Sequence, residues 1–388
     1  MKQVCPKYKY SSWSCLKTST KAICIISFIQ LVPITSHLST TYEYAIVDLR
    51  APRMASKQSI QERRQVMAKA EAEGLEYIGP CPSHLGEAWI EIPLPDGQTN
   101  RTKVVWPKSS APCPLVIYYH GGGLSRCSPD LVLAPARGFA TMFSCVVACP
   151  TLNQLPEQTF PGPLKNAWEV CAWLSDAKNL NDGILKDTGV SVDPGRGFVV
   201  GGISSGGAAA AVIGTIPGAI SAGVEDVIGM TPLQSTITGI FAGTPFLVTE
   251  AMLPAQYRDI FRSRDENKVA DDTARLEIES RLDVHSPWFS PINLNLSEFK
   301  TARNHPPKVF IYGGQLDEFR DDSTIYAKWL AQLEGVQVRA SVLEGEGHMG
   351  WLTPPWPASH TRRIKETTLD GMGWLLNLEW DRNQELPI

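Results

Sequence analysis

The chain has 388 residues, 43% of them hydrophobic and 20% charged, with a formal net charge of −4. A chain of this length can bury a large core, and single-domain α/β enzymes often exceed the usual domain size, so we expect one folded domain. The near-neutral balance without a basic stripe argues against a nucleic-acid partner, and the nine cysteines show no convincing metal spacing.

Residues 1–42 differ in composition from the rest of the chain. They contain five lysines, and the first acidic residue is Glu43. Within them, residues 22–34 form an apolar stretch that is too short and too interrupted for a comfortable membrane span but has the length of a signal-peptide core. We therefore expect no stable membrane span. Two interpretations stay open for residues 1–36: a secretory signal or anchor, or a disordered or wrongly predicted extension of a cytoplasmic protein, with Met54 as an alternative start.

Residues 56–74 form the next predicted element. Apolar and charged residues recur there with a helical period, which predicts an amphipathic helix. We expect this helix to lie outside the central sheet.

An apolar run, Leu115–Tyr119, predicts a buried parallel strand and is followed directly by the sequence His120-Gly121-Gly122-Gly123. The absence of side chains on the glycines would let a substrate carbonyl approach the backbone N–H groups of Gly121 and Gly122. This loop is therefore a candidate oxyanion-binding loop. Taken alone, such a glycine cluster is explained equally well by an ordinary tight turn.

The pentapeptide Gly202–Gly206 matches the GxSxG pattern of a nucleophile elbow, in which a serine sits on a sharp turn between a strand and a helix. A short β-prone run, residues 197–201, precedes Ser204, and a helix of very small side chains follows it. The match is weak by itself, but the glycine loop upstream makes a coincidence rare. Ser204 is therefore the candidate nucleophile, and the N–H of Ser205 would complete the oxyanion hole.

A long stretch, residues 231–283, separates the elbow from the next predicted strand. It mixes apolar and aromatic residues with a charged run from Arg258 to Arg281. We expect this stretch outside the sheet, and two interpretations stay open: a helical extension that closes the core, or a lid that contacts the substrate.

A nucleophilic serine needs a base, and the base needs an orienting carboxylate. In a fold with this elbow the order along the chain is Ser, Asp or Glu, then His. Residues 308–312 are a predicted strand, and four acids follow it closely: Asp317, Glu318, Asp321 and Asp322. Asp317 lies just past the strand and is the candidate acid. Asp321 and Asp322 stand at the start of a predicted helix, residues 323–333, which we expect them to cap.

His348 is the candidate base, because it follows a β-branched run, residues 336–343, and comes after the acid. The chain has seven histidines, and five of them precede Asp317: His37, His84, His120, His285 and His305. His360 is the remaining competitor. It lies in a Pro-rich segment away from any predicted strand end, so we expect it on a surface loop.

In these motifs the chain resembles the hormone-sensitive-lipase group of α/β-hydrolases, the carboxylesterases with an HGGG oxyanion motif. Four signatures of that group have counterparts in order: HGGG at residues 120–123, a partial LAPExxFP at 154–161, GISSGG at 202–207 where the group has GDSAGG, and DEFRDD at 317–322 where the group has DPLRDE. Two departures stand out. Ile203 replaces the acidic residue usual before the nucleophile, and Leu152-Asn153 replaces the usual Tyr-Arg pair.

The resemblance implies an α/β-hydrolase fold, with a mostly parallel central sheet flanked by helices and a helical cap. Residues 43–388 would then form a single domain, with cap elements at about 55–80 and 231–283.

The resemblance also implies a serine hydrolase that cleaves carboxylic esters of small to medium acyl groups through an acyl-enzyme. Ser204 would be the nucleophile, Asp317 the acid and His348 the base, and Gly121, Gly122 and Ser205 would form the oxyanion hole. The partner would be a small-molecule ester, with no cofactor and no metal. The alternatives are a lactonase, amidase or acyltransferase that tailors a natural product. From another class, a non-catalytic ligand receptor on a hydrolase scaffold is the alternative, although such receptors lose a triad member.

Overall fold

The structure is a computed structural model, which describes residues 59–109, 111–152, 155–267, 281–296, 304–348, 350–353 and 358–387. The chain divides into two units, Met1–Leu49 and Arg50–Ile388, and every described residue lies in the second. The predicted extension, residues 1–42, lies outside the described residues and stays a prediction.

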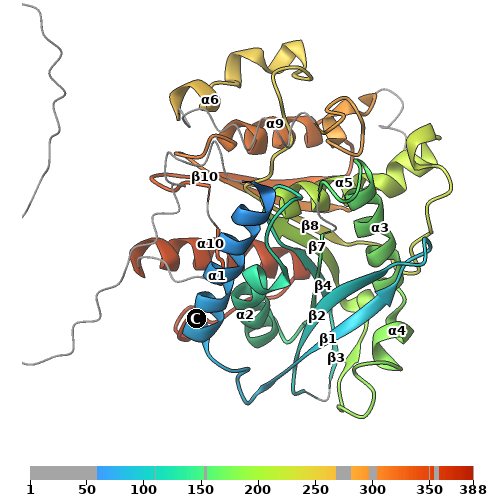
Figure 1. Cartoon of the computed structure of the whole chain (residues 1–388), viewed down its shortest axis with the longest axis vertical. Coiled ribbons are helices and arrows are strands. Elements are labelled where there is room, and N and C mark those ends of the chain that lie inside the picture. Colours follow the sequence, from blue (N-terminus) through green and yellow to red (C-terminus); the bar gives the residue numbers. More distant parts are fainter. Residues whose placement is uncertain are drawn as a thin grey trace, which may run out of the picture. The chain divides into compact units, whose positions relative to one another are not determined.

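An eight-stranded sheet with the order β1-β2-β5-β4-β7-β8-β9-β10 forms the centre of the second unit (Figure 1). β2 is antiparallel to both of its neighbours, and all pairs from β5 to β10 are parallel. The strands of this sheet are β1 (Leu85–Pro93), β2 (Thr99–Pro107), β4 (Leu115–Tyr119), β5 (Val146–Pro150), β7 (Phe198–Ile203), β8 (Gly239–Gly243), β9 (Lys308–Gly314) and β10 (Gln337–Leu343). A separate parallel pair is formed by β3 (Pro112–Cys113) and β6 (Ser191–Val192).

Helices cover both faces of the sheet, so the predicted mostly parallel sheet flanked by helices is confirmed (Figure 1). α3, α5 and α9 contribute to the core on one face, and α2 and α10 to the core on the other. The α-helices are α1 (Ile60–Ile78), α2 (Leu133–Phe143), α3 (Gly162–Leu174), α4 (Ala177–Asn181), α5 (Ser205–Ser221), α6 (Ser263–Glu266), α9 (Arg320–Leu330) and α10 (Ala358–Leu376). Short 3₁₀ helices are η2 (Pro129–Val132), η3 (Pro194–Arg196), η4 (Glu225–Val227), η5 (Ala255–Ile260) and η6 (Pro291–Asn293). No helix in the described part of the chain is long and apolar enough to span a bilayer.

The two cores explain why the central strands are apolar throughout. Successive side chains of a strand point to opposite faces. In β4, Leu115, Ile117 and Tyr119 lie in one core, whereas Val116 and Tyr118 lie in the other. A strand covered on both faces therefore has no polar side, as is typical of parallel sheets between helices.

β8 corrects the prediction that residues 231–283 lie outside the sheet. Its residues, Gly239–Gly243, pair in parallel with both β7 and β9 in the middle of the sheet. A five-residue apolar run that ends in glycine on both sides has no periodicity to separate a buried strand from a buried loop. The second predicted cap segment therefore begins only after Gly243.

The predicted N-terminal helix forms as α1, four residues later than expected. Ser59 is its N-cap: the backbone N–H of Glu62 donates to Ser59 Oγ (3.2 Å), and the N–H of Ser59 donates to the Glu62 carboxylate (2.6 Å). This reciprocal capping box satisfies two donors that would otherwise lack partners, and so it fixes where the helix begins.

Beyond α1, a buried charge network joins the edge of the sheet to α2. Glu87 on β1 lies between two cations, Lys103 on β2 (3.2 Å) and Arg137 on α2 (3.0 Å), and both cations are nearly inaccessible to solvent. Lys103 also pairs with Asp130 (2.8 Å), and Arg137 donates to the carbonyl of Gly79 at the end of α1 (2.9 Å). Glu87 thus neutralises charge that the protein has removed from water.

Replacing Glu87 with alanine should lower the free energy of unfolding by roughly 3 kcal/mol, because two buried cations would lose their shared partner. Glu91→Ala is the matched control, since Glu91 lies on the same strand with an exposed side chain, and it should change stability by less than about 0.5 kcal/mol. Urea unfolding curves of both variants measure the difference. Equal shifts would show that the network contributes nothing specific.

Candidate active site

Ser204 lies on the turn between β7 and α5. Its backbone angles, φ 57° and ψ −123°, are ones that residues with a side chain rarely adopt. The turn needs a glycine at position 202, because a Cβ there would lie 2.5 Å from the carbonyl carbon of Gly206. The N–H of Ser204 also donates to the carbonyl of Gly243 on β8 (2.9 Å). The elbow that the GxSxG pattern predicts is therefore present in its strained form.

The structure brings Ser204, His348 and Asp317 together in one hydrogen-bonded chain. His348 Nε2 lies 2.8 Å from Ser204 Oγ, and His348 Nδ1 lies 3.0 Å from Asp317 Oδ2. The three residues follow β7, β10 and β9, whose parallel arrangement places their carboxyl ends at one edge of the sheet. The Asp317 side chain is fully buried, and the His348 side chain is 33% exposed.

Both carboxylate oxygens of Asp317 have partners. Oδ2 faces His348, and Oδ1 accepts the backbone N–H of Phe319 (2.9 Å). The peptide carbonyl of Asp317 accepts the Asn267 side-chain amide (3.0 Å). The two contacts of the carboxylate fix its rotation, so that it holds the imidazole with Nε2 toward Ser204.

The electrostatics of this pair favour a proton on His348. Burial by itself lowers the pKa of His348, but the charge of Asp317 and its hydrogen bond outweigh burial, and the pKa is raised above its ordinary value of 6.5. An imidazole stabilised in its protonated form is a better acceptor for a serine proton. The arrangement can therefore deprotonate Ser204 when His348 is neutral.

The side chain of His120 makes two hydrogen bonds that orient the first peptides of the glycine loop. Its Nδ1 donates to the carbonyl of Gly121 (2.7 Å), and its Nε2 accepts the N–H of Leu152 (3.1 Å). Burial lowers the pKa of His120 to about 4, so that the ring stays neutral with one donor and one acceptor. Because the C=O and N–H of a trans peptide point in opposite directions, this bond turns the N–H of Gly122 away from His120.

The glycine loop with the predicted oxyanion donors comes close to Ser204. A Cβ on Gly121 would lie 3.1 Å from the Cβ of Ser204, so the loop passes directly over the nucleophile. Gly123 donates its N–H to Ser205 Oγ (3.0 Å), which ties the loop to the elbow. Ser205 is the first residue of α5, and its N–H therefore has no acceptor within the helix. This leaves the N–H groups of Gly121, Gly122 and Ser205 as the candidates to receive a developing negative charge.

The prediction that Asp321 and Asp322 cap a helix is wrong. α9 begins at Arg320, and no side chain caps its first turn. Asp321 instead accepts the backbone N–H groups of Arg262 and Ser263, at 2.6 Å each, from the start of α6. Long-range partners have therefore replaced the local ones that the sequence suggested.

Asp322 is a second buried carboxylate beside the acid loop. It accepts the N–H groups of Leu247 and Val248 (2.8 and 2.9 Å) and pairs with Arg264 (2.5 Å). Sequence reasoning missed Arg264, because a charged run in a linear sequence does not indicate which arginine faces inward. Only the position of Asp322 in the DPLRDE-like motif offered a signal.

His360, the predicted competitor for the base, lies in the first turn of α10 rather than in a surface loop. Its side chain lies outside the described residues.

A narrow cavity of about 40 Å³ opens next to Ser205 and Gly123. Apolar side chains line most of it, among them Leu124, Phe246 and Phe289. An apolar group of a bound substrate could lie there, within reach of the oxyanion donors. No three His, Cys, Asp or Glu side chains of the described residues gather closely enough to hold a metal ion.

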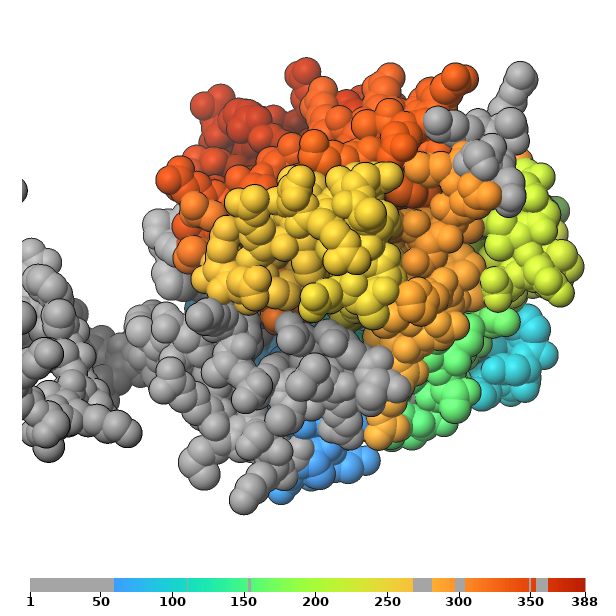
Figure 2. Space-filling view, turned by 90° about the horizontal axis from the view of Figure 1, so that it is seen from above, coloured from blue at the N-terminus to red at the C-terminus, as the bar shows by residue number. Residues whose placement is uncertain are grey.

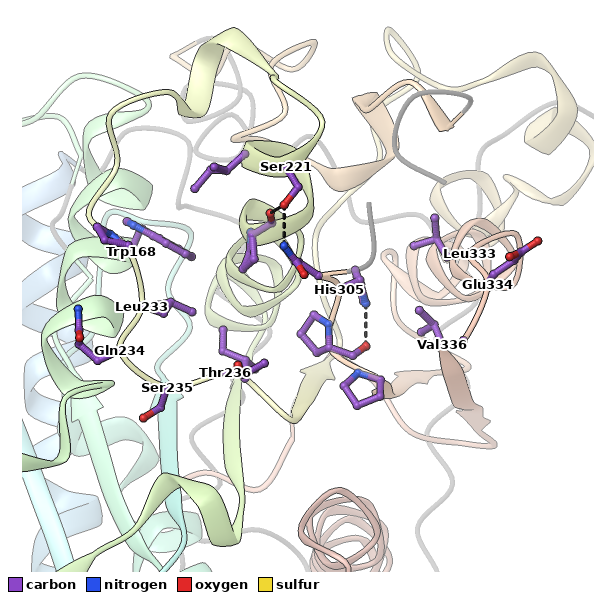
Figure 3. Close-up of a pocket in the computed structure, with 18 residues that line it drawn as sticks. Trp168, Ser221, Leu233, Gln234, Ser235, Thr236, His305, Leu333, Glu334 and Val336 are labelled. Carbon is purple, nitrogen blue, oxygen red and sulfur yellow. Dashed lines mark hydrogen bonds between the residues drawn. The ribbon is translucent and has the colours of Figure 1, made fainter. Parts of the chain in front are cut away.

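A larger cavity, about 640 Å³, lies at the far end of α5 (Figure 3). α5 has 17 residues, which at 1.5 Å each separate this cavity from Ser204 by about 25 Å. Two serines and one histidine line it: Ser221 accepts the Asn304 amide (2.6 Å), and His305 Nδ1 lies 2.8 Å from the carbonyl of Pro306. The smaller cavity, and not this one, adjoins the reactive groups.

The chain is similar to proteins with this fold and this kind of site. The family model described as the alpha/beta hydrolase fold matches residues 116–352, more than half of the chain. "Carboxylesterase 20" of Arabidopsis thaliana is 26% identical over 70% of this chain and 78% of its own length. "Carboxylesterase NlhH" of Mycobacterium tuberculosis is 26% identical over 63% of this chain and 70% of its own. The Pyrobaculum calidifontis esterase structure superposes with a TM-score of 0.65 at 21% identity, over 85% of this chain and 96% of that one.

The protein therefore belongs to the alpha/beta-hydrolase family. Within that family it falls in the hormone-sensitive-lipase-like carboxylesterase group that the HGGG motif indicated.

Asp317→Asn should leave the fold intact and lower turnover by about three to four orders of magnitude, because an amide favours the wrong imidazole tautomer and cannot stabilise the imidazolium. Asp321→Asn is the control, since that carboxylate contacts backbone N–H groups and not His348. It should cost stability and leave turnover of the folded protein within a few fold. Initial rates on a nitrophenyl ester, with thermal melts, separate the two effects. Near-parental turnover of the Asp317 variant would mean that another carboxylate is the acid.

Proposed function

We propose that this protein is a serine carboxylic-ester hydrolase that works through an acyl-enzyme intermediate. The observation that carries the proposal is the hydrogen-bonded chain from Ser204 through His348 to Asp317, next to a glycine loop with backbone donors. Similar proteins from a plant and a bacterium that are named carboxylesterases support the same class of reaction.

In this mechanism Ser204 Oγ attacks the ester carbonyl carbon while Nε2 of His348 takes its proton. The N–H groups of Gly121, Gly122 and Ser205 stabilise the negative charge that develops on the carbonyl oxygen. When the intermediate collapses, His348 returns the proton to the departing alcohol. Water, deprotonated in turn by His348, then attacks the acyl-enzyme and releases the acid, while Asp317 keeps the imidazole oriented throughout.

Two segments serve as the cap in this proposal: α1, and the stretch from Thr244 through α6. In Figure 2, which is seen from above, the yellow segment that contains η5 and α6 covers part of the surface of the second unit. Its contacts with Asp321 and Asp322 lie beside the loop of Asp317. A cap in this place would shield the acyl-enzyme from bulk water.

The narrow cavity beside Ser205 supports a preference for small or medium acyl groups. The cavity, of about 40 Å³, is small and is lined mainly by apolar side chains. No contact in the described residues favours lactone opening, amide hydrolysis or acyl transfer over ester hydrolysis. A ligand receptor would not need the ordered pairing of Ser204 with His348.

A panel of nitrophenyl esters should be cleaved best with acyl chains of two to about six carbons, because the apolar cavity beside Ser205 is small and Phe246 and Phe289 lie in its wall. Ser204→Ala should abolish turnover on every ester and prevent labelling by a fluorophosphonate probe. Best activity on emulsified long-chain triglycerides would contradict the acyl-size proposal, although not the reaction class.

The value of kcat/KM should fall as the pH is lowered, with a midpoint above pH 6.5. Only neutral His348 accepts the serine proton, and the pKa of His348 is raised. His120, with a pKa of about 4, should not contribute to this limb. In Asp317→Asn the residual activity should show a lower midpoint, since burial without the carboxylate lowers the pKa of His348. Rates measured from about pH 5 to 9 test both signs, and an unchanged midpoint in the variant would contradict the pairing.

A further inference from the structure

The inner face of α1 carries charged side chains where an amphipathic helix usually carries apolar ones. Arg64 and Glu71 lie seven positions apart, close to two helical turns, and therefore on the same face. Both side chains reach the segment that follows the oxyanion glycines, Ser125–Ser128. α1 thus meets the rest of the protein through directed polar contacts and not only through packing.

Arg64 makes four hydrogen bonds at a junction of two loops. Its Nε donates to the carbonyl of Ser125 (2.8 Å), and one terminal nitrogen donates to the carbonyl of Leu155 (2.8 Å). Both terminal nitrogens also meet the carboxylate of Glu157, at 2.6 and 2.7 Å. The hydrogen bond from Arg64 lowers the pKa of Glu157 to about 2, so that the pair stays ionised. A guanidinium alone among side chains can donate in this many fixed directions.

Glu71 holds the other end of the same segment. It is 6% exposed and accepts both the N–H (2.9 Å) and the hydroxyl (2.8 Å) of Ser128. The held segment bonds directly to the glycine loop, because the N–H groups of Ser125 and Arg126 donate to the carbonyl of Gly122 (3.2 and 3.1 Å). This carbonyl belongs to the Gly122–Gly123 peptide, whose N–H donates to Ser205 Oγ (3.0 Å), so the segment held by α1 is one hydrogen bond away from the glycine loop.

We propose that Arg64 is a positioning residue of the oxyanion hole. Its hydrogen bonds to the carbonyls of Ser125 and Leu155 hold the glycine loop in place, and thereby set where the N–H groups of Gly121 and Gly122 point. The inference rests on the proposed ester hydrolysis. In this proposal α1 helps to position the catalytic groups and also forms part of the cap. Because oxyanion donors act on the transition state more than on the bound substrate, a loosened loop lowers kcat and leaves KM nearly unchanged.

The test compares Arg64→Met and Arg64→Lys with Lys69→Met on the outer face of the same helix. Lys69 is 79% exposed and pairs only loosely with Glu73 (3.8 Å). Arg64→Met should lower kcat by about 10- to 100-fold, less than loss of a whole oxyanion donor, with KM within about threefold. Arg64→Lys keeps the charge but cannot donate in four directions, and should lower kcat nearly as much. Lys69→Met should match the parent.

A boronic-acid inhibitor adds a readout that a purely structural role would not move. Its Ki should rise by the same factor as kcat/KM falls, because the boronate oxygen occupies the oxyanion site. Thermal melts confirm that each variant is folded, and if Arg64→Met does not fold, Arg64→Lys carries the test alone. Unchanged kcat in a folded Arg64 variant, or a rise in KM alone, would overturn the inference. Absence of ester turnover by the parent protein would instead overturn the proposed function.

Discussion

The strained turn at Ser204 is the constraint on which the rest of the site depends. A residue with a side chain held at φ 57° costs about 1–3 kcal/mol and persists only where its surroundings leave no alternative. Here the contact of Gly202 with Gly206 and the bond to Gly243 leave none. The small side chains of α5 follow from this constraint, because a helix that starts at such a turn must pack against the sheet at close range.

The parts that surround the turn are held from outside the sheet, by two different segments. α1 contacts the glycine loop through Ser125 and Ser128, whereas the stretch that ends in α6 contacts the acid loop through Asp321 and Asp322. The strands bring the three reactive residues to one edge, but loops at a sheet edge are not rigid by themselves. Polar contacts from the two outer segments hold these loops in place. The position of each segment therefore affects the geometry of the site.

Local chemistry in the sequence was enough to predict much of this. Leu115–Tyr119 forms β4 with the predicted bounds, and the elbow turn lies at Ser204, since apolar runs and glycine motifs are local signals. β8 was missed because three apolar residues between two glycines have no distinguishing period. The partners of Asp321 and Asp322 were missed for another reason. Capping is the local use of a carboxylate at a helix start, and nothing in the sequence shows that segments 58 to 75 positions away supply better donors.

One short acidic run thus supplies three buried carboxylates, and the partners of two of them, Asp317 and Asp322, separate their roles. Asp322 faces Arg264, a permanent cation whose guanidinium also stacks on Phe319 at 4.8 Å. Burial raises the pKa of Asp322, and Arg264 counteracts it, so this carboxylate is compensated at all times and serves to hold the fold. Asp317 faces an imidazole, which can lose its proton. The negative charge of Asp317 is fully compensated only while His348 is protonated. When His348 is neutral, this charge favours transfer of the proton from Ser204 to His348.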